Sequence, residues 1–313
     1  MMSRIVHVAA AQLGPIARSE SRADVLVRLL EMMREAHACG CDLIVYPECA
    51  LTAFFPHWFM EDQNEIDEYF EREMPSPATQ PLFDEAARLG IGFHIGFAEL
   101  AEEDGETCHF NSSVLVGPDG ETVGKFRKIH LPGHADFRPD NAYQNLEQRY
   151  FDVGNLGFKV WRAFGGIFGM CICNDRRWPE TYRVMGLQGV EMVLLGYNTP
   201  YRHPEHPQLD TLANFHNQLS LQAGAYQNGT WVVGVAKAGN EEGVEQIGQS
   251  VIVAPSGEIV AMASTLEDEL ISYRCDLDQT KLYKEQIFNF EKYRRIEHYG
   301  LITERTAAIP PEE

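Results

Sequence analysis

The chain lacks the motifs of several common enzyme classes. No Gly-x-Gly-x-x-Gly opens a helix, no phosphate-binding P-loop occurs, and no Gly-x-Ser-x-Gly surrounds a serine nucleophile. Structural zinc sites use two pairs of ligands, but Cys171 and Cys173 have no second cysteine pair, and residues 203–206 lack the helix of a zinc protease. The sequence therefore gives no sign of a dinucleotide, a bound phosphate or a metal centre.

Positive charge is also scarce. The chain has 26 Lys and Arg against 46 Asp and Glu, which gives a net charge of −20 and argues against nucleic acids and anionic membranes as partners. No apolar run approaches the ~20 residues of a membrane span. The seven cysteines are an odd number and a poor disulfide framework, and the apolar start at residues 5–13 lacks the layout of a signal peptide. We therefore expect a reducing, cytoplasmic location.

Strand-like and helix-like segments alternate along all 313 residues, of which 44% are hydrophobic. No low-complexity linker divides them, so we expect one domain over residues 1–313, with a loose tail at about 303–313. Apolar strands between helical segments predict an α/β fold of packed sheets with helices outside. The expected strands are 4–13, 42–46, 91–98, 111–116, 122–126, 167–172, 191–195, 230–236 and 270–275, with a hairpin at 251–261; the expected helices are 21–38, 81–89, a short one after residue 178, and 209–227.

Two hairpins of similar design suggest an internal duplication. Residues 114–123 and 251–260 both consist of an apolar strand, a Gly- and Pro-containing turn and a second strand. This similarity predicts two related halves, each with a hairpin beside a strand–helix core.

The stretch around Cys173 is the strongest candidate for catalysis. An apolar run over residues 167–172 ends at this cysteine, two arginines follow at once, and Pro179 can open a helix. A thiol at a strand-to-helix turn lies near backbone N–H groups and a positive helix end, and both favour the nucleophilic thiolate. The alternative is that Cys173, like Cys171, is a small buried hydrophobe.

Glu48 and Lys128 could assist such a thiol. Glu48 ends an otherwise apolar strand, where a carboxylate needs a partner or a task, although a salt bridge or a helix cap would also satisfy it. Lys128 lies in a basic run that could be solvated or could point one cation inward. Together a glutamate can take the thiol proton and a lysine can stabilise an oxyanion, which suits attack on an amide-like carbonyl or nitrile carbon.

With these residues in view, the chain resembles the nitrilase superfamily of carbon–nitrogen hydrolases. Residues 45–48, 124–130 and 171–180 match its three motif blocks in order. The resemblance implies an α-β-β-α sandwich in a single domain and a Glu48–Lys128–Cys173 catalytic set without a cofactor. It also implies a homodimer or homotetramer.

Within that superfamily the chain resembles the N-carbamoyl-D-amino acid amidohydrolases, most specifically in residues 173–180 and also in residues 51–56, 128–134, 196–200 and 298–301. The implied reaction is hydrolysis of the ureido C–N bond of a carboxylate-bearing small molecule, with release of the D-amino acid, carbon dioxide and ammonia. Alternative functions are those of an aliphatic amidase, a β-ureido acid hydrolase, a nitrilase proper, and a catalytically silent binding or scaffold protein.

The resemblance also assigns roles to further residues. Glu147 matches a second family glutamate that orients the lysine, the substrate or water. Without the resemblance, Glu147 would be interpreted as a solvated charge in a loop. Paired arginines suit a carboxylate, and the alternative is that one of the two is structural. These amidohydrolases carry a histidine where this chain has Asn145, and this difference falls on the expected wall of the substrate pocket. The implied substrate-binding residues are Arg176, Arg177, Asn174 through its backbone N–H, Asn198, Thr199, His130 and Asn145.

Overall fold

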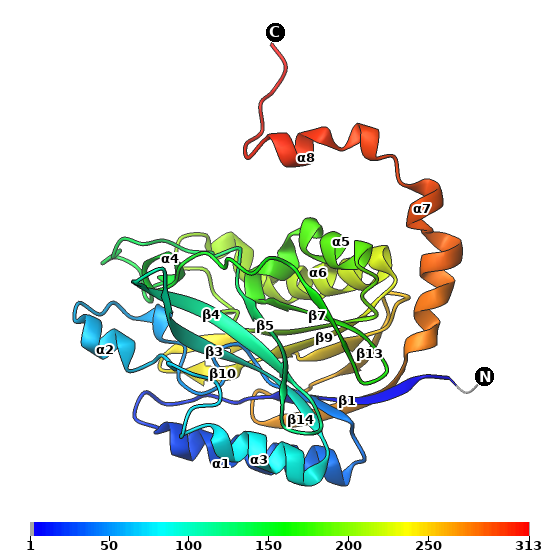
Figure 1. Ribbon diagram of the computed structural model, residues 1–313. Helices are drawn as coiled ribbons and strands as arrows, with labels where there is room; N and C mark the ends of the chain where they lie inside the picture. Colours follow the sequence, from blue (N-terminus) through cyan, green and yellow to red (C-terminus); the bar gives the residue numbers. More distant parts are fainter. Residues whose placement is uncertain (1–2, 313) are drawn as a thin grey trace.

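Two six-stranded sheets pack face to face in this structure, a computed structural model that describes residues 3–312 (Figure 1). Helices α1 (Arg22–Ala38) and α3 (Gln80–Leu89) cover the outer face of one sheet, at the bottom of Figure 1. Helices α5 (Pro179–Leu187) and α6 (Ala213–Asn228) cover the outer face of the other. The resulting α-β-β-α sandwich in a single domain is the fold expected from the sequence.

The first sheet has the strand order β14-β1-β2-β3-β4-β5. Its three central strands, β1 to β3, are parallel, and an antiparallel strand or hairpin borders them on each side. Its strands are β1 (Ile5–Gln12), β2 (Leu43–Val45), β3 (Gly92–Glu103), β4 (Glu106–Val116), β5 (Thr122–Arg127) and β14 (Glu269–Asp276).

The second sheet repeats this design, with the order β13-β12-β9-β8-β7-β6. Strands β7 to β9 are parallel, β6 borders them on one side, and the β12–β13 hairpin borders them on the other. The expectation of two similar halves is thereby confirmed. Its strands are β6 (Val160–Ala163), β7 (Gly166–Ile172), β8 (Met192–Tyr197), β9 (Trp231–Ala236), β12 (Val251–Val253) and β13 (Ile259–Met262), and a separate ribbon pairs β10 (Ala238–Glu241) with β11 (Val244–Ile247).

The remaining helical segments are short, and most lie in the connections at the edges of the sandwich. The α-helices among them are α2 (Gln63–Asp67), α4 (Glu147–Tyr150), α7 (Phe290–Tyr293) and α8 (Gly300–Glu304); the 3₁₀ turns are Phe55–His57, Cys173–Arg177, Pro207–Leu212, Leu277–Gln279 and Ile296–His298, and Leu282–Ile287 is a π-helical turn.

Strand β1 shows why the central strands read as continuous apolar runs. Alternate side chains of a strand point to opposite faces. Val6, Val8 and Ala10 join the core between the two sheets, whereas Ala9 and Ala11 pack against the helices outside. Both faces are therefore buried, as in the parallel sheets of other α/β proteins.

Several sequence predictions differ from the structure in detail. The helix expected from residue 209 begins with a 3₁₀ turn and continues as α6. Strand β6 and the β10–β11 ribbon were not predicted, because four-residue strands carry too little pattern. In the tail expected at about 303–313, α8 extends to Glu304, residues 305–312 contain no helix or strand, and residue 313 lies outside the described residues.

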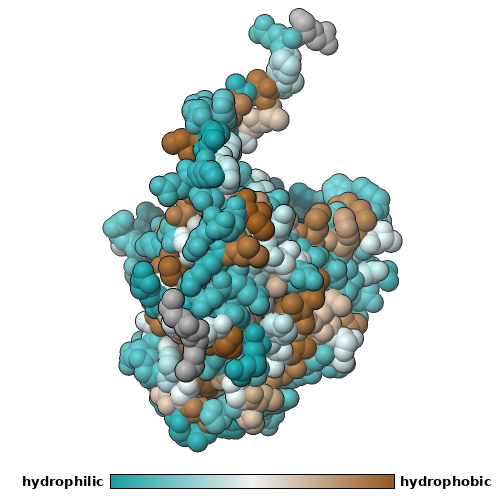
Figure 2. Space-filling view, turned by 90° about the vertical axis from the view of Figure 1, so that its right-hand side faces the viewer, coloured by the Kyte–Doolittle hydropathy of each residue, from teal (hydrophilic) through white to brown (hydrophobic). Residues whose placement is uncertain are grey.

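The chain after β14 runs along one side of the sandwich and then leaves it (Figure 1). Figure 2 shows this face, on which apolar side chains lie among polar ones. Exposed apolar residues of this segment are Leu282, Ile287, Tyr293, Ile296, Tyr299, Leu301 and Ile302. None of the helices in residues 3–312 is long and apolar enough to cross a membrane.

The fold brings the ends of several strands together where the two sheets meet. The backbone around Glu48, just after β2, lies between the facing strands β3 and β8. A side chain on Gly196 would come within 2.1 Å of the Glu48 nitrogen, and one on Gly96 within 2.7 Å of its Cα. Glycine at both positions therefore allows the two sheets to enclose Glu48.

Candidate active site

Glu48 is a fully buried carboxylate with four hydrogen bonds. Its Oε1 accepts from Lys128 Nζ and from Asn111 Nδ2, each at 2.7 Å. Its Oε2 accepts from the Asn198 backbone N–H at 2.8 Å and from Asn198 Nδ2 at 3.2 Å. Burial works to raise the pKa of Glu48, but the charge and hydrogen bond of Lys128, together with the two asparagines, hold the pKa below its usual value. Glu48 is therefore ionised at neutral pH.

Lys128 lies between two carboxylates, with none of its side chain exposed. It directly follows β5, and its backbone N–H donates to the Asn111 carbonyl at 2.8 Å. Its Nζ donates to Glu48 Oε1 at 2.7 Å and to Glu147 Oε2 at 2.5 Å. Burial works to lower the pKa of Lys128, but the charges of Cys173, Glu147 and Glu48 raise it well above its usual value. The ammonium group is therefore permanently charged.

Glu147 is also a buried carboxyl group, but its pKa is raised whereas that of Glu48 is lowered. It is the first residue of α4, and its main contact is the ion pair with Lys128. Burial and the charge of Glu48 raise its pKa to about 7, against the opposing charge of Lys128. Two neighbouring carboxyl groups with pKa values pushed apart are the arrangement expected of a proton-transfer pair.

Cys173 completes this group. It follows β7 directly, adopts a left-handed backbone with φ of 46°, and opens a 3₁₀ turn. Its Sγ and carboxylate oxygens of Glu48 and Glu147 lie within 4.8 Å of one another. Thiolate and carboxylate groups can bind metal ions, but here Lys128 Nζ already lies between the two carboxylates.

The protonation of Cys173 differs from the sequence prediction. The turn was expected to favour thiolate, but burial and the negative charge of Glu48 raise the pKa of the thiol, and Lys128 and Arg176 only partly oppose this. The resting group is therefore a thiol. Nucleophilic attack then requires transfer of its proton to a neighbouring base.

Of the two arginines expected at the substrate, Arg176 has the contacts of a structural residue. It is 1% exposed, and its guanidinium donates to Asn217 Oδ1, the Cys173 carbonyl and Thr199 Oγ1 at 3.0, 2.6 and 2.9 Å. It also lies over the Tyr197 ring at 4.4 Å. With its donors engaged, Arg176 supports the turn that carries Cys173.

Arg177, by contrast, is accessible from a cavity of about 630 Å³. Among residues 3–312, its guanidinium has no hydrogen bond or ion pair with another side chain. The surrounding protein and the charge of Arg176 lower its pKa to about 10, so it is still charged at neutral pH. An unpaired guanidinium on a cavity wall can bind an anionic group.

The cavity lies between the loop before α4 and the segment that leads to α6. The four catalytic candidates do not line it, but Thr199 and Arg177 do. Thr199 follows Asn198, whose carbonyl oxygen is 3.6 Å from Cys173 Sγ. Arg177 follows Arg176, whose Nη1 is 3.8 Å from the same sulfur. The thiol therefore lies just beyond the cavity wall. Other residues along the wall are His134, Arg138, Tyr143, Arg202, His203, Glu205, His206 and His216.

Asn198 and Thr199 support other site residues. Asn198 holds both the carboxylate and the backbone carbonyl of Glu48, the latter at 2.9 Å. Thr199 accepts from Arg176 and also lines the cavity. Asn198 was expected to bind substrate; its two nitrogens hold Glu48, and its Oδ1 has no hydrogen-bond partner among residues 3–312, so substrate binding stays a prediction.

His130 and Asn174 brace the Cys173 turn. The backbone N–H and Nδ1 of His130 both contact Asp175 Oδ1, at 2.9 and 2.8 Å, and its ring stacks on Trp178. Asn174 Nδ2 donates to the His130 carbonyl at 3.1 Å. The backbone N–H of Asn174 is the second of the turn, a position without an acceptor inside a helix, so it remains a candidate oxyanion donor.

Asn145 lines the cavity, as expected of a substrate-binding residue. Its backbone carbonyl accepts from the His134 N–H at 2.9 Å, which holds the loop beside the cavity. Sequence reasoning missed Asn111 and Asp175, which hold Glu48 and the Cys173 turn. Asn111 could have been found as the start of a polar Asn-Ser-Ser run that directly precedes the apolar end of its strand.

Comparison with known proteins shows the family of the chain. The family model for "Carbon-nitrogen hydrolase" matches residues 7–285. The N-carbamoylputrescine amidase of Arabidopsis thaliana is 31% identical over 283 residues, 87% of each chain. The citrullinase of Francisella tularensis is 28% identical over 287 residues, 89% of this chain and 92% of that one. The crystal structure of a carbon–nitrogen hydrolase from Helicobacter pylori superposes with a TM-score of 0.81 at 21% identity, covering 96% of this chain and 99% of the other.

Proposed function

The chain belongs to the carbon–nitrogen hydrolases of the nitrilase superfamily, and we propose that it hydrolyses the ureido C–N bond of N-carbamoyl amino acids. From the resemblance in residues 173–180 and 196–200 we further propose the D configuration. The observation that carries the carboxylate-bearing substrate is Arg177, an unpaired cation on a cavity wall in a chain with a net charge of −20.

In the proposed mechanism Cys173 is the nucleophile and Glu48 the base. Glu48 takes the Sγ proton, and the sulfur attacks the ureido carbon. Lys128 Nζ and the backbone N–H of Asn174 then hold the oxyanion of the tetrahedral intermediate. The cluster of sulfur and carboxylate oxygens within 4.8 Å supports this proton transfer.

Collapse of the intermediate breaks a C–N bond and expels an amine, which takes up the proton that Glu48 received from the Cys173 thiol. Water deprotonated by Glu48 then cleaves the remaining thioester-like bond and returns the thiol of Cys173. Either order of leaving groups gives a carbamic acid that breaks down, so that the products are the amino acid, carbon dioxide and ammonia. Glu147, whose pKa is raised to about 7, can hold a proton near neutral pH and orient the leaving amine and the water by hydrogen bonds.

A second candidate function is hydrolysis of N-carbamoyl amines. Its support is the similarity to N-carbamoylputrescine amidases, at 30–31% identity in three plants. A substrate with a protonated amine would meet Arg177, which carries the same charge, whereas a carboxylate would form charge-assisted hydrogen bonds with it. The cavity wall therefore favours the amino acid derivatives.

Ammonia release from a matched panel tests the proposal. The panel contains N-carbamoyl-D- and L-amino acids, β-ureido acids, N-carbamoylputrescine, simple amides and nitriles, with Cys173→Ala as the control. We expect turnover of the N-carbamoyl-D-amino acids and none with Cys173→Ala. Turnover of only N-carbamoylputrescine or neutral amides would refute the carboxylate assignment, and turnover by Cys173→Ala would refute the nucleophile.

We also propose that the chain assembles into a homodimer or homotetramer. The exposed apolar side chains after β14, and Phe215 and Leu219 on α6, support this because they would be covered in an assembly. Light scattering of the purified protein measures the mass directly, and a monomer at micromolar concentration would contradict the proposal.

A further inference from the structure

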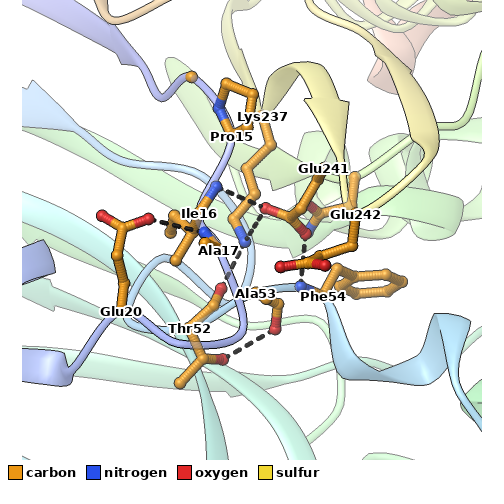
Figure 3. Close-up of polar contacts among 12 residues, drawn as sticks. Pro15, Ile16, Ala17, Glu20, Thr52, Ala53, Phe54, Lys237, Glu241 and Glu242 are labelled. Carbon is orange, nitrogen blue, oxygen red and sulfur yellow. Dashed lines mark hydrogen bonds and ion pairs between the residues drawn. The ribbon is translucent and has the colours of Figure 1, made fainter.

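Lys237 and Glu241 form another buried ion pair, which the proposed chemistry does not use (Figure 3). Lys237 follows β9, and Glu241 ends β10. Their Nζ and Oε2 atoms are 3.2 Å apart, with neither side chain exposed. Burying two charges costs free energy that their attraction does not always repay. The contacts of the pair therefore indicate what it stabilises.

All the other side-chain partners of this pair are backbone groups. Lys237 Nζ donates to the Thr52 carbonyl. Glu241 Oε1 accepts from the Phe54 N–H at 2.6 Å, and its Oε2 accepts from the Ile16 N–H at 3.1 Å. In Figure 3 the two charged side chains lie between the segment after β1 and the segment after β2. The pair thus holds residues 52–54 at two points.

The segment held in this way is the one that carries Glu48. Residues 46–54 contain no helix or strand, and Cys49 has a left-handed φ of 46°. Near Glu48 the backbone is anchored by its carbonyl, which accepts from Asn198 Nδ2, and by the Ala50 N–H, which donates to Gly96. Further along the segment, Thr52 and Phe54 are held by the Lys237–Glu241 pair. Loss of the pair would free one end of a short, strained segment.

Lys237 also supports Glu48 indirectly, through the end of β8 in the opposite sheet. Its backbone N–H donates to the Tyr197 carbonyl at 3.1 Å. The next residue, Asn198, supplies two of the four hydrogen bonds to the Glu48 carboxylate. Lys237 therefore contacts both segments between which this carboxylate is held.

We propose that the Lys237–Glu241 pair positions Glu48, by fixing residues 49–54 and the end of β8 so that the carboxylate keeps its contacts with Asn198 and Lys128. The inference rests on the proposed role of Glu48 as the base. Lys237 and Glu241 are positioning residues that act through the backbone of the segment and do not touch the reacting atoms.

The main test is the double variant Lys237→Met, Glu241→Gln, which removes both charges at similar volume. Misplacement of a catalytic group by about 1 Å can cost about 100-fold in rate, so we expect kcat to fall by about 10- to 100-fold. KM should change by less than about twofold, because the cavity wall is untouched. Lys237→Arg, which keeps a cation and donors, should restore most of kcat.

The pH profile gives a second readout. Contacts from Asn198 help to hold the pKa of Glu48 low, so their loss would move the acid limb of kcat/KM to higher pH. Lys128, Glu147 and Cys173 face Glu48 and stay unchanged in the double variant. A profile identical to that of the wild type, together with unchanged kcat, would overturn the inference.

Glu191→Gln is the matched control for a general loss of stability. Glu191 pairs with Arg4 and accepts from the Ile167 N–H, at the end of the parallel strands opposite to Cys173. This variant should lower the melting temperature and leave kcat and the pH profile unchanged. If it changed both as the double variant does, the role of Lys237 and Glu241 would be structural only.

Alkylation of Cys173 by iodoacetamide separates this inference from the proposed function, since it needs no substrate. Peptide mass spectrometry distinguishes Cys173 from exposed cysteines such as Cys39. Below the melting temperature of each variant, the double variant and Glu48→Gln should both react at least about tenfold more slowly than the wild type, because the thiol proton then lacks a well-placed buried base to receive it and this loss outweighs the lower thiol pKa that follows from removing the Glu48 charge. If no ureido compound is hydrolysed but the alkylation rates of both variants fall, the proposed substrate is wrong and the positioning role is supported. If the double variant does not fold, Glu241→Gln alone, which keeps the Lys237–Thr52 contact, must show the same slowing, and a wild-type rate would refute the role.

Discussion

Replacing Glu147 by glutamine should change how the stability of the protein depends on pH. Burial and the charge of Glu48 raise the pKa of Glu147 from 4.5 to about 7. Between these values the folded protein holds a proton that the unfolded chain has released. The wild-type protein therefore loses stability as the pH rises from 4.5 to 7. Glutamine does not titrate, so the Glu147→Gln protein lacks this loss.

The size of the effect follows from the two pKa values. One pH unit corresponds to about 1.36 kcal/mol, so a rise from 4.5 to about 7 corresponds to about 3 kcal/mol. Urea unfolding at pH 5 and pH 8, at one protein concentration, measures it. The free energy of unfolding of Glu147→Gln relative to the wild type should increase by about 3 kcal/mol over this interval. Buried His57 and His94 occur in both proteins, and their contributions cancel. Turnover should fall by about 100-fold or more.

Glu99→Gln provides a matched control. Glu99 is also buried, but hydrogen bonds from Arg127 and Lys125 outweigh burial and lower its pKa to about 2. It is ionised throughout the interval, so the curve of Glu99→Gln should run parallel to that of the wild type. If the Glu147→Gln curve is also parallel, Glu147 is ionised at pH 5, and its assignment as a neutral acid at the start of catalysis is refuted.

The remaining predictions concern the two arginines and a buried histidine. Arg177→Met should raise KM for carboxylate-bearing ureides about 10- to 100-fold without a matching rise for neutral amides; equal effects on both would contradict carboxylate binding. Arg176→Met should lower the free energy of unfolding by about 3 kcal/mol, because it leaves buried acceptors unpaired; urea unfolding measures this, and wild-type stability would argue against the supporting role. Burial and the charge of Lys237 lower the pKa of His57 from 6.5 to about 3, so the wild type loses stability as the pH falls from 6.5 to 3. His57→Phe should unfold with a flatter pH dependence in this range, and an unchanged slope would show that His57 does not cause the loss.

The overall fold could be predicted because its strands are long apolar runs and its two hairpins resemble each other. The order of the strands could not, since it depends on close approach at particular residues. Gly96 and Gly196 are examples: the sequence shows two glycines in strands, and only the structure shows that they enclose Glu48. Short elements such as β6 carry too few residues for a pattern.

Glu48, Lys128 and Cys173 could be identified because each lies where a predicted strand ends, whereas Glu147 was assigned only through the family resemblance. The roles of their neighbours could not, because adjacent residues in a turn point in different directions. Arg176 and Arg177 look alike in the sequence, yet one is buried and fully bonded and the other is unpaired on a cavity wall. The ionisation of Cys173 was predicted wrongly because burial outweighs the favourable local turn.

The buried charges of the site explain why one lysine is combined with two glutamates and a thiol. With Lys128 protonated, Glu48 ionised, Glu147 carrying its proton and Cys173 a thiol, the group has no net charge. Transfer of the thiol proton to Glu48 turns a carboxylate–thiol pair into a carboxylic acid–thiolate pair and leaves the net charge at zero. Since burying an additional charge is costly, a transfer within the group is cheaper than loss of the proton to solvent. The lysine offsets whichever group is ionised, so the same arrangement serves both the resting enzyme and the attacking thiolate.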